Sequence, residues 1–328
     1  MKQFRRRRGI DFTDNGASAS RKTPARFTFL ILAVSFLGLS ASSGHAQRGR
    51  RGGGRFSGYR TTTAPPPKRE IFPGNTFTFC RIQYRSVTSE ALGHGWNTDY
   101  PDADINFSIR LAELTTIKIN HDDAFKDYDN PGGIVHSLIR LTDDALFEYP
   151  IIYMVDVGVV GFNRQEAERL GSYLRKGGFL HVDDFWGDPA WRKWVVEIGK
   201  ALPPDEYPIV DIPLDHPIFN IVFQLDGVPQ VPSIQYWRQS GGKTAESVHI
   251  GDTLTPHGRG IFDEDGRLMV FMTHNTDIAD GWENYGKDPD FSALFSEPKA
   301  VPLGINIVAY ALTSGQTPAL SEEPPPSR

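Results

Sequence analysis

The chain of 328 residues contains a single cysteine, Cys80, which limits the chemistry open to it. One thiol cannot form a disulfide within the chain, so the fold must be stable from its hydrophobic core alone. It also excludes zinc or redox sites built from several cysteines. The phosphate-binding loop of nucleotide hydrolases, the glycine fingerprint of dinucleotide-binding folds and the GxSxG elbow are missing too. The sequence therefore holds no complete catalytic motif of these classes.

Positive charge is scarce in most of the chain and concentrated at its start. Residues 1–75 contain 15 lysines and arginines against three acidic residues, whereas the rest of the chain contains 20 against 37. Binding to nucleic acid needs clustered lysine and arginine to contact phosphates. We therefore expect no nucleic-acid partner for the acidic part. A basic leader on an acidic body is typical of an exported or membrane-proximal protein.

An uncharged apolar run lies at residues 27–41, with basic residues before it and small residues after it. This order is typical of a secretory signal peptide, which predicts that residues 1–46 are removed and that the protein is exported to the periplasm. The run is shorter than the roughly 20 apolar residues that a spanning helix needs. The alternative is an uncleaved membrane anchor formed by residues 27–44.

The segments on either side of the expected domain are low in apolar residues. Residues 47–75 are rich in arginine, glycine and proline, which predicts a disordered linker. We interpret it as a spacer, or alternatively as a basic arm that touches anionic membrane or cell wall. Residues 316–328 are expected to form a disordered tail. One folded domain is therefore expected over residues 76–315.

The clearest structural signal is a strand–helix–strand pattern in the middle of the chain. Residues 150–157 form an apolar run typical of a buried strand. Asn163 and Glu166 fit a capping box that begins a helix, and Gly177 with the next glycine can end it. A second apolar run follows at residues 179–182. This order predicts two neighbouring parallel strands joined by a helix.

Other segments extend the same pattern. Residues 77–84 and 267–273 show strand patterns, and residues 103–114 and 301–312 show helical spacing. A further helix is expected within residues 132–145, because apolar residues there fall near helical spacing. Together these patterns predict an α/β fold in three layers, with a mostly parallel sheet and helices on both of its faces.

Polar side chains follow the expected strands, at the sheet edge where ligands bind in such folds. Asp183, Asp184 and His274 are the candidate catalytic residues, because carboxylates and imidazole can act as general bases or bind a metal. Neighbouring side chains diverge in an extended backbone, so one aspartate is expected to face a cleft. The other could cap a helix. The alternative for His274 is a hydrogen-bonded loop that anchors Trp282.

Eight further side chains are candidates for ligand binding. They are Trp96, Asp99, Asp104, Asp156, Trp186, Asn275, Asp277 and Trp282. The stretch around Asp99 and Asp104 has some likeness to a calcium loop, but its spacing differs from an EF-hand and the glycine and closing glutamate are missing. A turn followed by a helix cap explains it equally. Trp96 either stacks on a sugar ring or packs in the core. No cofactor is predicted, and a divalent metal is kept as an alternative.

Three motifs resemble those of the bacterial domain-of-unknown-function family DUF4159. They are residues 96–107, residues 177–187, and residues 274–283 followed by residues 303–306. The resemblance covers roughly residues 76–314. It implies a fold related to class I glutamine amidotransferase-like, flavodoxin-like and trehalose-utilisation-like (ThuA-like) proteins. Amidotransferases place a nucleophilic cysteine at the turn where this chain has Asp183 and Asp184, so glutamine hydrolysis is not expected.

Two functions from different classes fit these observations. The first is a non-catalytic module that binds a ligand or assists envelope assembly, with envelope proteins or carbohydrate as partners. The alternative is a hydrolase or metal-assisted enzyme that acts on a carbohydrate or cell-envelope substrate. The enzyme is favoured if the His274 ring and the Asp183 or Asp184 carboxylate lie within about 4–6 Å of each other in an open cleft, and disfavoured if each is bound separately to backbone groups.

Overall fold

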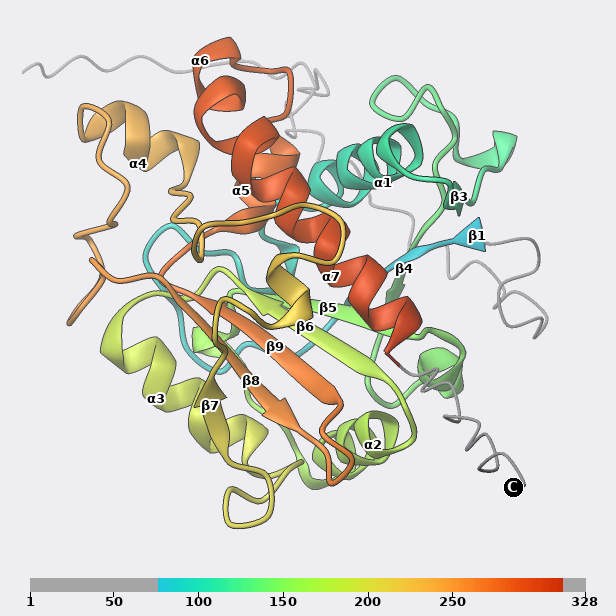
Figure 1. Ribbon diagram of the computed structural model, residues 1–328, viewed down its shortest axis with the longest axis vertical. Helices are drawn as coiled ribbons and strands as arrows, with labels where there is room; N and C mark the ends of the chain where they lie inside the picture. The colour runs from blue at the N-terminus through green and yellow to red at the C-terminus, as the bar shows by residue number, and fades with distance from the viewer. Residues whose placement is uncertain (1–75, 315–328) are drawn as a thin grey trace, which may run out of the picture. The chain divides into compact units, whose positions relative to one another are not determined.

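The computed structural model describes residues 76–314 (Figure 1). The expected signal peptide (1–46), linker (47–75) and tail (316–328) lie outside the described residues. Within residues 76–314, no helix combines the length and the apolar character that crossing a bilayer requires.

A mixed sheet of seven strands runs through the domain, in the order β4-β2-β5-β6-β9-β8-β7. Its parallel strands are β2 (Phe79–Ile82), β4 (His136–Ile139), β5 (Ile151–Val155), β6 (Phe179–Asp183) and β9 (Leu268–His274). β8 (His257–Phe262) is antiparallel to β9, and β7 (Ile209–Asp211) is antiparallel to β8. The short strands β1 (Thr76–Phe77) and β3 (Lys118–Ile119) pair separately. The expected α/β fold is confirmed.

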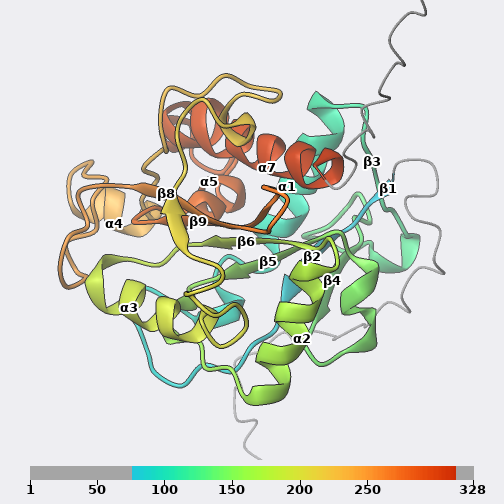
Figure 2. The ribbon, with the colours of Figure 1, turned by 60° about the horizontal axis from the view of Figure 1, so that its bottom comes forward.

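Helices lie on both faces of the sheet, as Figure 2 shows. α2 (Arg164–Arg175) and α3 (Gly187–Ile198) cover one face, and α1 (Asp102–Leu114), α5 (Ile278–Glu283) and α7 (Val301–Thr313) cover the other. The shorter helices are α4 (Ile234–Gln239), α6 (Pro289–Phe291) and the π-helical stretch η6 (Ser292–Ala300). The 3₁₀ turns are η1 (Gly95–Asn97), η2 (Asp123–Phe125), η3 (Asp144–Glu148), η4 (Val157–Val159) and η5 (Pro217–Phe219).

The start of α2 follows from its sequence. The Asn163 side chain accepts a hydrogen bond from the backbone N–H of Glu166, and the Glu166 carboxylate accepts one from the backbone N–H of Asn163. Ala167, Leu170 and Leu174 form the buried stripe on the same helix. The predicted capping box is confirmed, because both of its partners lie within three residues of each other.

Two strands of the seven-stranded sheet, β4 and β8, were not anticipated from local pattern. The helix expected within residues 132–145 is wrong, since residues 136–139 form β4 and pair with β2 along their whole length. Their alternating burial is that of a strand at a sheet edge. β8 escaped notice because it contains two glycines. At Gly260 a Cβ atom would lie 2.3 Å from the Leu268 side chain and 3.0 Å from the Val270 carbonyl oxygen, so a larger residue would require these neighbours to shift.

The parallel strands β2, β5, β6 and β9 end at one edge of the sheet, where the chain turns sharply. Asp156, Asp184 and Asn275 stand at or just after the ends of β5, β6 and β9, and their φ angles are 53°, 50° and 61°. Few residues other than glycine adopt this left-handed conformation, and those that do are frequent at functional sites. A functional site is therefore expected at this edge of the sheet.

Candidate functional site

A cavity of about 230 Å³ lies at this edge of the sheet. Eight of its lining side chains carry carboxyl groups: Glu90, Asp99, Asp156, Asp184, Glu246, Asp277, Asp280 and Glu283. Two histidines, His94 and His249, also line it, but among the described residues no lysine or arginine does. So many carboxyl groups without a basic side chain favour a cationic ligand.

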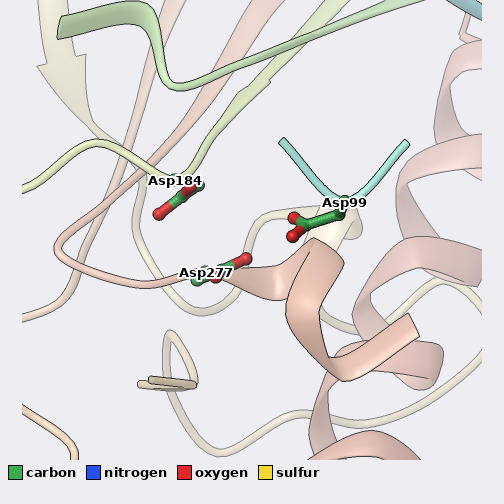
Figure 3. A group of neighbouring side chains, drawn as sticks. All are labelled: Asp99, Asp184 and Asp277. Carbon is green, nitrogen blue, oxygen red and sulfur yellow. The ribbon is translucent and has the colours of Figure 1, made fainter. Parts of the chain in front are cut away.

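Three of these carboxyl groups converge from different loops (Figure 3). One oxygen from each of Asp99, Asp184 and Asp277 lies within 4.8 Å of the others. Asp99 also belongs to a second group with Asp280 and Glu283, whose ligand atoms meet the same limit. Carboxylate oxygens are the ligands that Ca²⁺ and Mg²⁺ prefer. The arrangement can therefore hold a hard divalent cation.

The carboxyl group of Asp99 has an oxygen without a hydrogen-bond partner in the described part of the chain. Its Oδ2 atom is shielded from solvent and has no hydrogen-bond partner among the described residues. Burial and the nearby Glu283 carboxylate raise the pKa of Asp99, although Arg81 opposes the shift. A buried charged oxygen without a partner costs free energy unless a proton or a cation compensates it.

A buried ion pair holds the turn that carries Asp99. Arg81 on β2 and Asp104 on α1 are both fully buried, with 2.5 Å between Nη2 and Oδ1. Arg81 Nη1 also donates to the carbonyl oxygens of Thr98, at 2.8 Å, and of Trp96, at 3.2 Å. Asp104, expected to bind ligand, therefore serves as an anchor in the core. The Trp96 ring packs against the Tyr100 ring and does not line the cavity.

The adjacent aspartates at the end of β6 have different surroundings. Asp184 lines the cavity, and its Oδ1 accepts a hydrogen bond from Trp186 Nε1 at 2.9 Å. Asp183 is buried outside the cavity lining and accepts from the Thr273 hydroxyl at 2.5 Å and from Ala279 N, at the start of α5, at 2.9 Å. Burial raises the pKa of Asp183 to about 7, although these hydrogen bonds oppose the shift. Asp184 therefore faces the cavity, whereas Asp183 is buried and accepts a hydrogen bond from the first turn of α5; the N-cap of the next helix, α3, is Trp186.

His274 does not join the aspartates in the cavity. Its Nε2 lies 3.2 Å from the Gly187 carbonyl oxygen, and its Nδ1 lies 3.2 Å from Arg259 Nη1. The ring packs against Phe185 and Trp191. Burial lowers the pKa of His274 to about 3, so the imidazole is neutral at physiological pH. The expected pairing of His274 with Asp183 or Asp184 in an open cleft is therefore not formed.

Asn275 and Trp282 also lie outside the cavity lining. Asn275 accepts a hydrogen bond from Gly187 N and donates to two backbone carbonyls in the segment before β8. Trp282 is buried against Phe107 and donates from Nε1 to the Ala300 carbonyl. These two predicted ligand-binding residues therefore serve to hold the loops and the core together.

Asp277, at the start of α5, is a predicted residue of the third motif that lines the cavity. It caps α5, because its Oδ1 accepts a hydrogen bond from Asp280 N at 2.8 Å. Asp280 and Glu283, which the sequence reasoning missed, follow at intervals of three residues. Residues three apart lie near one another on a helix surface. The spacing of Asp277, Asp280 and Glu283 could therefore have revealed an acidic face of α5.

Glu90, Glu246 and His249 form a second polar group in the cavity wall. His249 Nδ1 lies 3.2 Å from Glu90 Oε1, and its Nε2 lies 3.3 Å from Glu246 Oε2. Burial lowers the pKa of His249, but hydrogen bonds to the two glutamates outweigh it and raise the pKa to about 9. His249 is not among the candidate residues predicted from the sequence. Its loop carries no periodic pattern that could have placed it here.

Asp156 lies beside this second group. Its Oδ2 accepts a hydrogen bond from Gly95 N at 2.6 Å. Burial and the Glu90 carboxylate raise the pKa of Asp156 to about 8. Asp156 therefore holds a proton at neutral pH.

Comparison with known families places this cavity in context. A family described as Domain of unknown function (DUF4159) matches residues 78–312. The chain belongs to the DUF4159 family. The match confirms the resemblance inferred from the three sequence motifs, and it includes every residue that lines the cavity. A comparison with curated proteins found no match.

The chemistry of the cavity in this DUF4159 domain has two parts. The carboxylates around Asp99 can bind a hard cation through oxygen ligands. The group formed by Asp156, Glu90 and His249 can hold protons close to that position. Both parts lie in one cavity, which supports a single functional site at the carboxyl edge of the sheet.

Proposed function

We propose that this DUF4159 domain is a ligand-binding module whose acidic cavity holds a hard divalent cation such as Ca²⁺, Mg²⁺ or Mn²⁺. The observation that carries the proposal is the buried, unpartnered Oδ2 of Asp99, whose carboxyl group has an oxygen within 4.8 Å of oxygens of Asp184 and Asp277. Ionised carboxylates this close repel each other unless protons or a cation neutralise them. A divalent cation would compensate all three.

The ligand is proposed to bind through the cation. A water molecule takes about 30 Å³ of liquid volume, so a cavity of about 230 Å³ has room for more than an ion. Trp186 adds an aromatic surface to the lining. These features suit an oxygen-rich carbohydrate or another cell-envelope component, whose hydroxyl or carboxyl oxygens would complete the coordination of the cation.

The proposal also includes the location of the protein and the relationship of its fold to other proteins. The N-terminal sequence supports an exported, periplasmic protein or a membrane-anchored one. The sheet with helices on both faces supports a relationship to class I glutamine amidotransferase-like and flavodoxin-like folds. Asp183 and Asp184 replace the cysteine of the amidotransferases, and Cys80 is buried on β2. Both facts favour a function without a nucleophilic thiol.

Titration of the EDTA-treated full chain with Ca²⁺, Mg²⁺ and Mn²⁺ tests the cation site. We expect at least one ion to bind in calorimetry and to raise the melting temperature, because a ligand of the native state stabilises it. Asp99→Asn should abolish both effects, because it removes the negative charge of the central carboxylate. The variant should still fold, since asparagine accepts the left-handed backbone of this position. Asp205→Asn, an exposed site away from the cavity, is the control. Absence of binding by every ion would overturn the proposal.

A metal-assisted hydrolase is a second candidate function, favoured by one observation. Asp156 and Glu90 share the cavity with the carboxylates of the cation group. A bound cation makes water more acidic, the neighbouring Glu90 carboxylate can accept the proton of that water, and the protonated Asp156 can donate a proton to the leaving group. Cation-dependent release of sugars from envelope polysaccharide would support hydrolysis if Asp156→Asn abolished it without weakening cation binding. Cation binding without turnover would contradict the hydrolase and support the ligand-binding module.

A further inference from the structure

The carboxylates of the cavity form two groups that share one member. We propose that the cavity holds two adjacent divalent cations bridged by the Asp99 carboxylate. Asp184 and Asp277 complete the first cation site, and Asp280 and Glu283 complete the second. This inference rests on the proposed function, because a second cation requires the first to bind.

Asp99 is suited to bridge two ions. Its carboxylate belongs to both groups, and the ligand atoms within each group lie no more than 4.8 Å apart. Its Oδ2 is shielded from solvent and has no partner among the described residues, so a cation bound there would satisfy it. Figure 3 shows the Asp99 carboxyl group near those of Asp184 and Asp277. A carboxylate has two oxygens, so Asp99 can contact both ions.

The other ligands of the first site are held in place by donors of the protein. Asp184 Oδ1 accepts from Trp186 Nε1 at 2.9 Å. Asp277 Oδ1 accepts from Asp280 N at 2.8 Å. A hydrogen bond to one oxygen orients a carboxylate and leaves its second oxygen for a metal.

The second site is arranged in the same way. Asp280 Oδ2 accepts from Ile234 N at 2.7 Å, and Glu283 Oε2 accepts from Asn284 Nδ2 at 3.0 Å. Each of these side chains therefore also has one oxygen oriented by the protein and one that can reach an ion.

The start of helix α5 brings the two sites close together. Asp277 is the N-cap residue of α5 and contributes to the first site, whereas Asp280, in the first turn of the helix, contributes to the second. A hydrogen bond of 2.8 Å from Asp280 N to Asp277 Oδ1 joins the two residues directly. Ions in known two-metal sites lie about 3.5–4 Å apart. Ligands joined in this way at one helix end suit such a pair.

The charges also balance better with two ions than with one. The two groups contain five carboxylates, which carry five negative charges when all are ionised. One divalent ion neutralises two of them, whereas two ions neutralise four. One negative charge then remains, because Lys287, whose Nζ is 3.8 Å from Glu283 Oε1, also pairs with Asp102 at 2.5 Å. A pair of ions thus brings the cluster close to neutrality.

The test is the stoichiometry of Mn²⁺ on the EDTA-treated full chain, measured by equilibrium dialysis with metal analysis. We expect two Mn²⁺ per chain and the electron paramagnetic resonance spectrum of a coupled pair. Glu283→Gln and Asp184→Asn should each leave one uncoupled ion, and Asp99→Asn should lose the pair. Asp205→Asn and Glu206→Gln, both exposed, are the charge-matched controls and should keep two.

The possible results separate this inference from the proposed function. If the parent protein and Glu283→Gln each bind one Mn²⁺, the proposal of a second ion is overturned, but the proposal of a single cation site stands. No Mn²⁺ at all, under conditions where the other ions fail too, overturns both. Two coupled ions that survive Asp99→Asn overturn the bridging role. Asp280→Asn repeats the test of the second site if Glu283→Gln does not fold by circular dichroism.

Discussion

Arg81 and Asp104 form a fully buried ion pair that connects the core of the domain to its acidic cavity. The same guanidinium holds the carbonyl oxygen of Thr98, the residue before Asp99. β2 and α1 thereby position the carboxylate that both cation groups share. The ion pair thus acts on the site without lining it.

Breaking this pair should destabilise the domain and weaken cation binding. Asp104→Asn leaves the Arg81 charge buried without its partner, which costs about 3–5 kcal/mol. Since 1 kcal/mol shifts the melting temperature of a domain of this size by about 2–4 °C, we expect a fall of roughly 10 °C. Thermal unfolding followed by circular dichroism measures it. An unchanged melting temperature would contradict the anchoring role of the pair.

The two neighbouring aspartates should respond differently to the same change. Asp183→Asn disturbs hydrogen bonds to Thr273 and Ala279 inside the core, which should cost about 1–3 kcal/mol. Asp184→Asn removes one of several repelling carboxylates, so the cation-free protein should be as stable as the parent or more so. Its affinity for the cation should fall at least tenfold. Thermal unfolding and calorimetric titration of both variants measure these effects, and equal effects of the two would refute the division of roles.

Stability at alkaline pH should depend on Asp156. Burial and Glu90 raise its pKa to about 8 from the ordinary value of 3.8, so the folded state binds this proton more tightly than the unfolded state. The stabilisation is therefore complete below about pH 4 and is lost as the pH rises through 8. Asp156→Asn cannot ionise and should gain stability over the parent between pH 5 and 9, on the order of 1–3 kcal/mol. Urea unfolding of both proteins at these pH values tests this, and a constant difference would count against it.

His274 should matter for folding and not for the cation. His274→Asn removes a ring packed against Phe185 and Trp191 and hydrogen-bonded to Gly187, so its melting temperature should fall by several degrees. Cation affinity and stoichiometry should stay within twofold of the parent. Calorimetric titration below the melting temperature of the variant measures both. If folded His274→Asn lost cation binding, His274 would have to contribute to the cation site, and this prediction would be wrong.

Several parts of this architecture follow from local sequence. The capping box of Asn163 and Glu166 begins α2 because its hydrogen bonds span only three residues. Continuous apolar runs define β5 and β6, since both faces of these strands are buried. The sequence also identified the polar residues at the strand ends, including Asp156, Asp184 and Asp277, which line the cavity.

The tertiary structure alone decided which of those residues meet. Asp183 and His274 follow strands as Asp184 does, yet hydrogen bonds in the core hold both outside the cavity lining. Glu246 and His249 enter the cavity from a loop that shows no periodic pattern. The physical reason is that local periodicity reports burial along one element. The meeting of distant loops depends on strand order and on the packing of α5 against the sheet edge.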